Sequence, residues 1–143
     1  ITTNGYYPDR VKNIVHDIFK KCPDINLSIN MSIDGIGEDH DKIRGLKNSF
    51  KNMVETYKQV KELQKKYKKL NAQTASVLML SNQDKMKELL DWIDSNMNIS
   101  EHGLMLSRGD SPTPEGKEPN SIYLHKMLHH YRQSLQKGSA CRS

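Results

Sequence analysis

Apolar and polar residues follow two different periods along this 143-residue chain. From residue 8 to 22 the apolar positions recur every three or four residues, which predicts an amphipathic helix that Pro8 opens and Pro23 ends. In residues 25–34, INLSINMSID, apolar and polar residues alternate strictly. This period of two predicts a strand with one apolar and one polar face. In a strand between helices, the polar face would line a cavity or a barrel lumen.

The same two periods continue along the rest of the chain. The predicted elements are a helix over 46–70, a strand over 72–80, a helix over 83–97, a strand over 103–107, a loop over 109–119 and a helix over 120–136. Ser81 or Asn82 is expected to cap the helix that follows it. A coiled coil is the alternative for the longest helix, but the neighbouring strands favour a helix packed on a sheet.

Strands that alternate with helices predict an α/β fold with a parallel sheet. The carboxyl ends of parallel strands meet at one edge, where ligands bind. Four segments would share that edge: TNG at 3–5, SIDG at 32–35, SN at 81–82 and SRG at 107–109. All four are rich in small or polar residues, so we expect a ligand-binding rim.

Composition and charge narrow the choice of partners. The net charge is +5, and much of it comes from lysines on the predicted 46–70 helix. We interpret them as a solvated helix face and expect no nucleic-acid partner. No apolar run approaches the about 20 residues that span a bilayer, so no membrane partner is expected. Cys22 and Cys141 lie far apart and predict reduced thiols in a cytoplasmic protein.

Two of these segments, with HDKIRG at 40–45, together resemble the radical S-adenosylmethionine (SAM) superfamily. TNG at 3–5 is similar to the end of its third barrel strand. SIDG at 32–35, followed by HDKIRG at 40–45, resembles the S-[ILM]-D-G and H-D-x-x-R-G signature after the fourth strand. That signature is familiar from peptide- and protein-modifying members such as the sulfatase maturases. The resemblance covers residues 1–114.

The resemblance implies a partial (β/α)6 barrel, strands three to six, in residues 1–114, with an amphipathic helix and a frayed tail in 115–143. It implies SAM as cofactor and a [4Fe–4S] cluster that cleaves it to a 5′-deoxyadenosyl radical, acting on a substrate that is a peptide or protein. The residues carried over as cofactor-binding are Asn4, Ser32, Asp34 and Arg44.

Each carried-over residue has an implied role. Ser32 would hydrogen-bond the ribose or the carboxylate of SAM, and Arg44 would pair with that carboxylate. Asp34 would shape the turn, and Asn4 would lie near the cofactor from the next strand. His40 and Asp41 of the second motif are expected to organise the loop. For Asp34 and Asp41, the alternative interpretation is a structural role in turns and helix caps.

The sequence departs from the family at its defining motif. CxxxCxxC, which supplies the cluster ligands, does not occur here, nor does the acidic, glycine-rich segment after the second strand. We expect both to precede Ile1 in a longer protein, and we expect this piece alone to be inactive. The alternatives are a non-enzymatic α/β binding module and a helical interaction protein built on the lysine-rich helix.

Two other motifs carry less weight. His125 and His129 have the i, i+4 spacing of metal ligands, but no third ligand stands out and HExxH is absent, so no metal site is expected. Arg108-Gly109-Asp110 spells an adhesion tripeptide. Its position after a strand favours a structural role at the rim.

Overall fold

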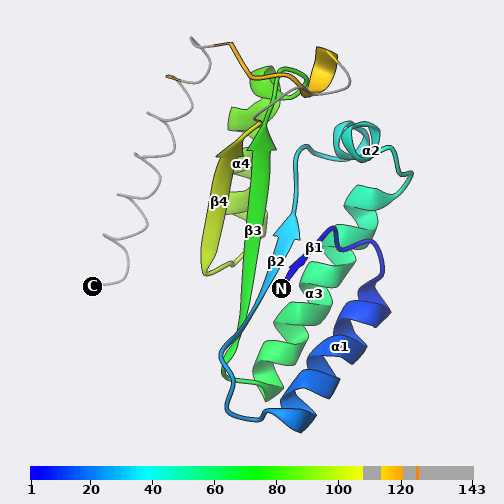
Figure 1. The fold of residues 1–143 in the computed structure, drawn as a ribbon, viewed down its shortest axis with the longest axis vertical. Coiled ribbons are helices and arrows are strands. Elements are labelled where there is room, and N and C mark those ends of the chain that lie inside the picture. Colours follow the sequence, from blue (N-terminus) through cyan, green and yellow to red (C-terminus); the bar gives the residue numbers. More distant parts are fainter. Residues whose placement is uncertain (108–113, 121–124, 126–143) are drawn as a thin grey trace.

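The computed structural model describes residues 1–107, 114–120 and 125. In chain order the elements are β1 (Thr2–Thr3), α1 (Pro8–Lys21), β2 (Leu27–Ser32), α2 (Glu38–Arg44), α3 (Ser49–Lys66), β3 (Leu70–Leu78), the 3-10 turn η1 (Gln83–Lys85), α4 (Met86–Asn96), β4 (Glu101–Leu106) and η2 (Pro114–Gly116). In this part of the chain the strands form one sheet, in the order β1-β2-β3-β4, and every pair is parallel (Figure 1). The predicted α/β class with a parallel sheet is therefore confirmed.

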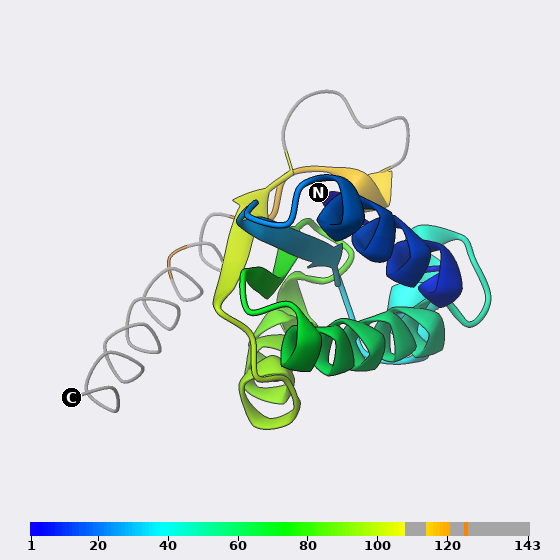
Figure 2. The ribbon, with the colours of Figure 1, turned by 90° about the horizontal axis from the view of Figure 1, so that it is seen from below.

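The hydrophobic core lies between the sheet and the helices. The long helices α1, α3 and α4 lie along one side of the sheet (Figure 2). In α1, Val11, Val15 and Phe19 are buried at intervals of four residues, as the apolar spacing predicts. They belong to the same apolar cluster as the buried residues of β2, β3, α3 and α4. One core therefore joins the elements from α1 to α4.

Strand β2 has the two faces that its sequence predicts. Leu27, Ile29 and Met31 are buried in the core, whereas the residues between them are only half-buried. The register places the polar residues of this second face beside polar residues of the neighbouring strands. The row across the sheet is Thr2, Asn30, Gln73 and Glu101. A polar face therefore runs across the side of the sheet opposite the core.

Helix α2 corrects the expectation that His40 and Asp41 lie in a loop. Its first turn holds Glu38 and Asp39, and its last turn holds Lys42 and Arg44. These charges complement the helix dipole, and Gly45 ends the helix with a left-handed φ of 63°. The signals for a short helix were therefore present in the sequence. The motif resemblance predicted a loop instead.

The longest helix is shorter than its apolar spacing predicts. α3 ends at Lys66, and Leu70 already pairs with Leu27 in the sheet. The chain leaves the helix at Tyr67, whose ring stacks on Phe19 with centroids 4.3 Å apart. Apolar residues at 67 and 70 fit the helical period and the start of a strand equally well. Only the packing of this segment against α1 distinguishes a longer helix from the start of a strand.

Other expected elements shift or fall outside the described residues. β2 and β4 differ from their expected ranges by one to two residues at each end, and β3 begins and ends two residues earlier than expected. Of the expected helix over 120–136, only Asn120 and His125 are described. The segment Arg108-Gly109-Asp110, His129 and Cys141 lie outside the described residues. Within the described part, no helix is both long and apolar enough to cross a membrane.

Candidate functional site

The candidate site lies at the carboxyl ends of the strands. Asn4, Asp34 and Ser107 follow β1, β2 and β4, and Asn82 lies four residues beyond β3. Because the strands are parallel, these positions share one edge of the sheet, as predicted. Arg108 and Gly109 of the predicted rim lie outside the described residues.

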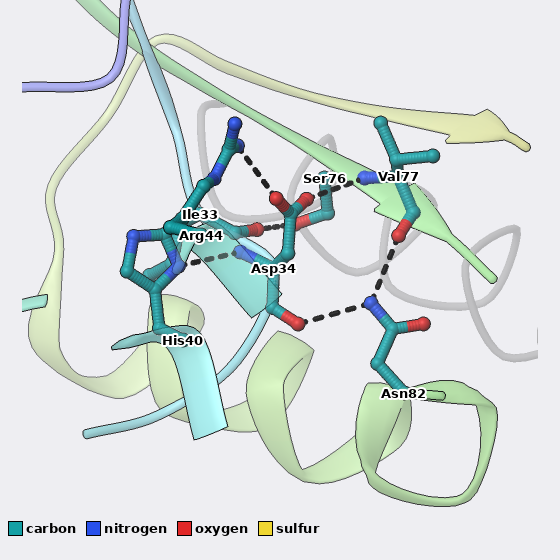
Figure 3. A network of polar contacts seen from close by, with 7 residues as sticks. All are labelled: Ile33, Asp34, His40, Arg44, Ser76, Val77 and Asn82. Atoms are coloured by element: carbon teal, nitrogen blue, oxygen red, sulfur yellow. Dashed lines mark hydrogen bonds and ion pairs between the residues drawn. The ribbon is translucent and has the colours of Figure 1, made fainter. Parts of the chain in front are cut away.

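Asp34 is the centre of a polar network at this edge (Figure 3). Its carboxylate is 3% exposed, and its Oδ2 lies 2.5 Å from Nη2 of Arg44. Its Oδ1 accepts the backbone N–H of Val77 at 2.8 Å, two residues beyond the last ladder partner of β2 in β3. The side chain therefore extends the contact between β2 and β3 past the end of the ladder.

His40 and Arg44 reach Asp34 from the same face of α2. They are spaced i, i+4, which places them one turn apart, and both point toward Asp34 in Figure 3. The backbone N–H of Asp34 donates to Nδ1 of His40 at 3.1 Å. The two motif segments, SIDG and HDKIRG, are thus joined through one aspartate.

Asn82 closes the network from the β3 side. Its Nδ2 donates to the carbonyl oxygen of Asp34 at 3.0 Å and to that of Val77 at 2.9 Å, and its Oδ1 accepts the N–H of Met79 at 2.9 Å. Ser76 also donates, through Oγ, to the carbonyl of Ile33. Asn82 occupies the expected cap position, but it makes no side-chain cap bond to the helix. Sequence reasoning missed its role because no local pattern marks a contact with residue 34.

Burial sets the protonation of this network. Burial, assisted by the Arg44 charge, lowers the pKa of His40 to about 4, so the ring is neutral at neutral pH. Since Nδ1 accepts a hydrogen bond, the ring proton is on Nε2. Burial raises the pKa of Asp34, while the Val77 N–H and the Arg44 guanidinium oppose that shift. Both oxygens of the carboxylate thus have partners that belong to the chain.

Asp41 does structural work on the other side of α2. Its Oδ2 accepts the N–H of Asn48 at 2.7 Å, and its Oδ1 accepts the N–H of Phe50 at 2.8 Å. These groups belong to the start of α3, so Asp41 caps that helix from a distance. The same hydrogen bonds lower the pKa of Asp41, that to Phe50 most.

The structure does not bring all four carried-over residues into one network. Asp34 and Arg44 are joined directly. Ser32 ends β2 and is half-buried on the polar face, whereas Asn4 is exposed and accepts the N–H of Tyr6 through Oδ1 at 3.1 Å. Ser32 and Asn4 therefore share the edge of the sheet with the pair without contacting it.

Two glycines of the motif segments are required by close packing. Gly5 has a φ of 67°, and a Cβ there would lie 3.0 Å from the Cα of Met53 in α3. A Cβ on Gly35 would lie 2.9 Å from the backbone N of His40. The glycine of TNG thus lets α3 approach β1, and that of SIDG lets α2 approach β2.

The polar face next to Arg44 has features that fit a polar cofactor. Nε of Arg44 and Oδ1 of Asn30 are buried atoms without a hydrogen-bond partner within the part of the chain that the structure describes. Beside them, Ser32, Ala75 and Gly103 form a row of small side chains across the sheet. These residues could hold SAM through a carboxylate on Arg44 and through hydroxyl and amide groups.

A [4Fe–4S] cluster does not fit the described residues. Cys22 is free and exposed just after the last residue of α1, before β2 begins, and thus far from the carboxyl ends. Over residues 1–107, 114–120 and 125, no group of three or more histidine, cysteine or acidic residues could hold a metal ion. We therefore derive no chemical step through a cluster.

Comparison with known proteins identifies no relative of this chain. The chain matches no protein-family model, and a search of curated proteins finds no match. Its function has to be inferred from its own residues.

Proposed function

We propose that this chain is part of a radical SAM enzyme and contributes one side of the SAM site. The observation that carries the proposal is the Arg44 guanidinium. The Arg44 side chain is 28% exposed, Asp34 holds its Nη2, and its buried Nε has no partner among the described residues. A guanidinium that is fixed at one corner can bind a carboxylate through its remaining N–H groups.

The residues of the network act as a positioning system in this proposal. Asp34 holds Arg44 in place, and Asp34 is itself held by Val77, His40 and Asn82. Preorganisation of this kind reduces the entropy that binding costs. Ser32 would supply a hydroxyl beside the carboxylate. In this superfamily, SAM supplies the radical chemistry. The proposed substrate is a peptide or a protein.

Ligand binding tests the role of Arg44. SAM and S-adenosylhomocysteine carry the amino-acid carboxylate, whereas 5′-methylthioadenosine lacks it. An Arg44→Lys variant should bind the first two about tenfold more weakly, as for one lost charge-assisted hydrogen bond, and bind the third unchanged. Arg10→Lys, at an exposed arginine of α1, is the matched control. Equal losses for all three ligands would contradict the proposed contact.

The reaction itself requires cluster ligands. The proposal requires a CxxxCxxC segment on the N-terminal side of Ile1 in the same coding sequence. Anaerobic reconstitution of that longer protein with iron and sulfide should then yield 5′-deoxyadenosine from SAM. A start codon directly before Ile1 would count against the enzyme.

A non-enzymatic α/β binding module is the second candidate. It is favoured by the carboxylate of Asp34, because both of its oxygens already have partners within the chain. Such a carboxylate is structural. This candidate predicts ligand binding at the sheet edge without SAM selectivity, which the three-ligand comparison also measures.

A further inference from the structure

A cleft lies at the carboxyl edge of the sheet, between α2 and the turn that connects β3 to α4. It encloses about 350 Å3, which is within the size range of small-molecule sites. We call it the α2–α4 cleft. Its lining includes Gly35, Lys42, Ile43, Met79 and Lys85. The cleft shares Asp34 with the proposed SAM site, but Ser32 and Arg44 are not part of its lining.

The floor of the cleft is preformed. Asp34 and Asn82 line it, and they are only 2% and 4% exposed. The hydrogen bond from Asn82 to the Asp34 carbonyl joins the two walls at 3.0 Å. A ligand would therefore meet a fixed surface, and little conformational entropy would be lost on binding.

The mouth of the cleft carries two positive charges, those of Lys42 and Lys85. Lys85 Nζ lies 2.6 Å from Asp39 Oδ2, so this ion pair connects η1 to α2 across the opening. Lys42 is 74% exposed and lies 4.0 Å from Glu38, a loose contact. The hydrogen bond that Lys85 donates to Asp39 raises the pKa of Lys85, so its ammonium group stays charged at neutral pH. Exposed ion pairs are weak, and either lysine can turn toward a ligand at little cost.

The walls below the mouth are apolar. Ile43 and Met79 are both half-buried and line the cleft from opposite sides, from α2 and from the turn after β3. Methionine adapts its shape to a bound group. An apolar interior below a cationic mouth matches a molecule that has an apolar body and one anionic group.

We propose that the α2–α4 cleft binds a small organic anion. Its apolar body lies between Ile43 and Met79, and its carboxylate or phosphate is bound by Lys42 and Lys85. The site does not depend on SAM, and it stands whether or not the chain belongs to a radical SAM enzyme.

Titration followed by amide NMR tests the site with three probes of similar apolar body. 4-Phenylbutyrate and 4-phenylbutyl phosphate carry the two anionic groups, and 4-phenylbutylamine carries a cation instead. The two anions should shift the amide signals of Gly35, Ile43 and Ser81 saturably, whereas the amine should not. The stronger of the two anions identifies the head group that the cleft prefers.

Matched lysine variants then test the charges. Lys42→Met and Lys85→Met should each weaken anion binding about tenfold, as expected for one charge-assisted hydrogen bond. Lys65→Met and Lys87→Met are the controls, because these lysines are equally exposed, at 74% and 57%, and each forms an ion pair within its own helix. Neither control should change the affinity.

Three results would overturn the proposal. The first is the absence of saturable shifts with both anions, and the second is equal binding of the amine. The third is an equal loss of affinity in the control variants, which would indicate attraction to the overall positive charge. Because Lys42→Met leaves Arg44 intact, SAM binding should not change, and the two proposals can fail separately.

Discussion

Arg44 and Asp34 lie ten residues apart in sequence and form a 2.5 Å ion pair in which the carboxylate is buried and the guanidinium is partly open to solvent. The pair connects α2 to the end of β2. It thereby joins SIDG and HDKIRG, two of the three segments on which the resemblance to radical SAM enzymes rests.

Removing the charge of Asp34 should destabilise the fold. Asp34→Asn keeps an acceptor for Val77 but leaves Arg44 without its counter-ion, so we expect a loss of about 2–3 kcal/mol in the free energy of unfolding. Urea denaturation measures it. Asp24→Asn is the matched control, because Asp24 is 95% exposed in its pair with Lys69 and should contribute under about 0.5 kcal/mol. Similar losses in both variants would show that the buried ion pair contributes no more to stability than the exposed one.

Asn82 should contribute as much to stability as a buried core residue. Asn82→Ala removes three hydrogen bonds at the edge of the sheet, each worth about 1 kcal/mol, for a loss of about 3 kcal/mol. Asn96→Ala removes a single exposed bond to the Trp92 carbonyl and should cost about 0.5 kcal/mol or less. If chemical denaturation gives the two variants equal losses in the free energy of unfolding, the hydrogen bonds of Asn82 do not stabilise the fold.

Gly35 should not tolerate a side chain, although Gly103 should. The Cβ of Gly35→Ala would lie 2.9 Å from a backbone atom, and we expect a loss of about 1–3 kcal/mol. In Gly103→Ala the new Cβ would lie 3.8 Å from the Ala75 side chain, an ordinary contact. That variant should be neutral or slightly stabilising. Thermal unfolding of the two alanine variants decides between them, and a tolerated Gly35→Ala would mean that α2 can move away.

His40 should make stability depend on pH in the acid range. Its pKa is about 4 in the folded state and 6.5 when unfolded, so between these values the unfolded chain binds more protons. The free energy of unfolding should therefore rise with pH from about 4 to 6.5, by on the order of 3 kcal/mol from this residue.

His102 complicates the pH test because burial also lowers its pKa to about 4. The variants His40→Gln and His102→Gln, measured by urea unfolding across this pH range, separate the two contributions. Asp41 acts outside the window, because its pKa is lowered from 3.8 and its contribution is lost only below that value. An unchanged pH profile in His40→Gln would contradict the neutral, buried ring.

The period of the apolar residues determined much of the fold. Strict alternation from 25 to 34 fixed β2 and its two faces, and Pro8 fixed the start of α1. The alternation of strands with helices fixed the parallel sheet and, with it, the shared edge for Asn4, Asp34 and Asn82. These features follow from local geometry, because one residue more or fewer would move an apolar side chain to the wrong face.

Tertiary structure alone decided which polar contacts form at the carboxyl edge of the sheet. That Asp34 pairs with Arg44, that Asn82 clamps residues 34 and 77, and that α3 ends at Lys66 all depend on contacts between distant segments. Polar side chains have several partners of similar strength within reach. The choice among them is set by the packing of the helices on the sheet, which a residue pattern does not contain.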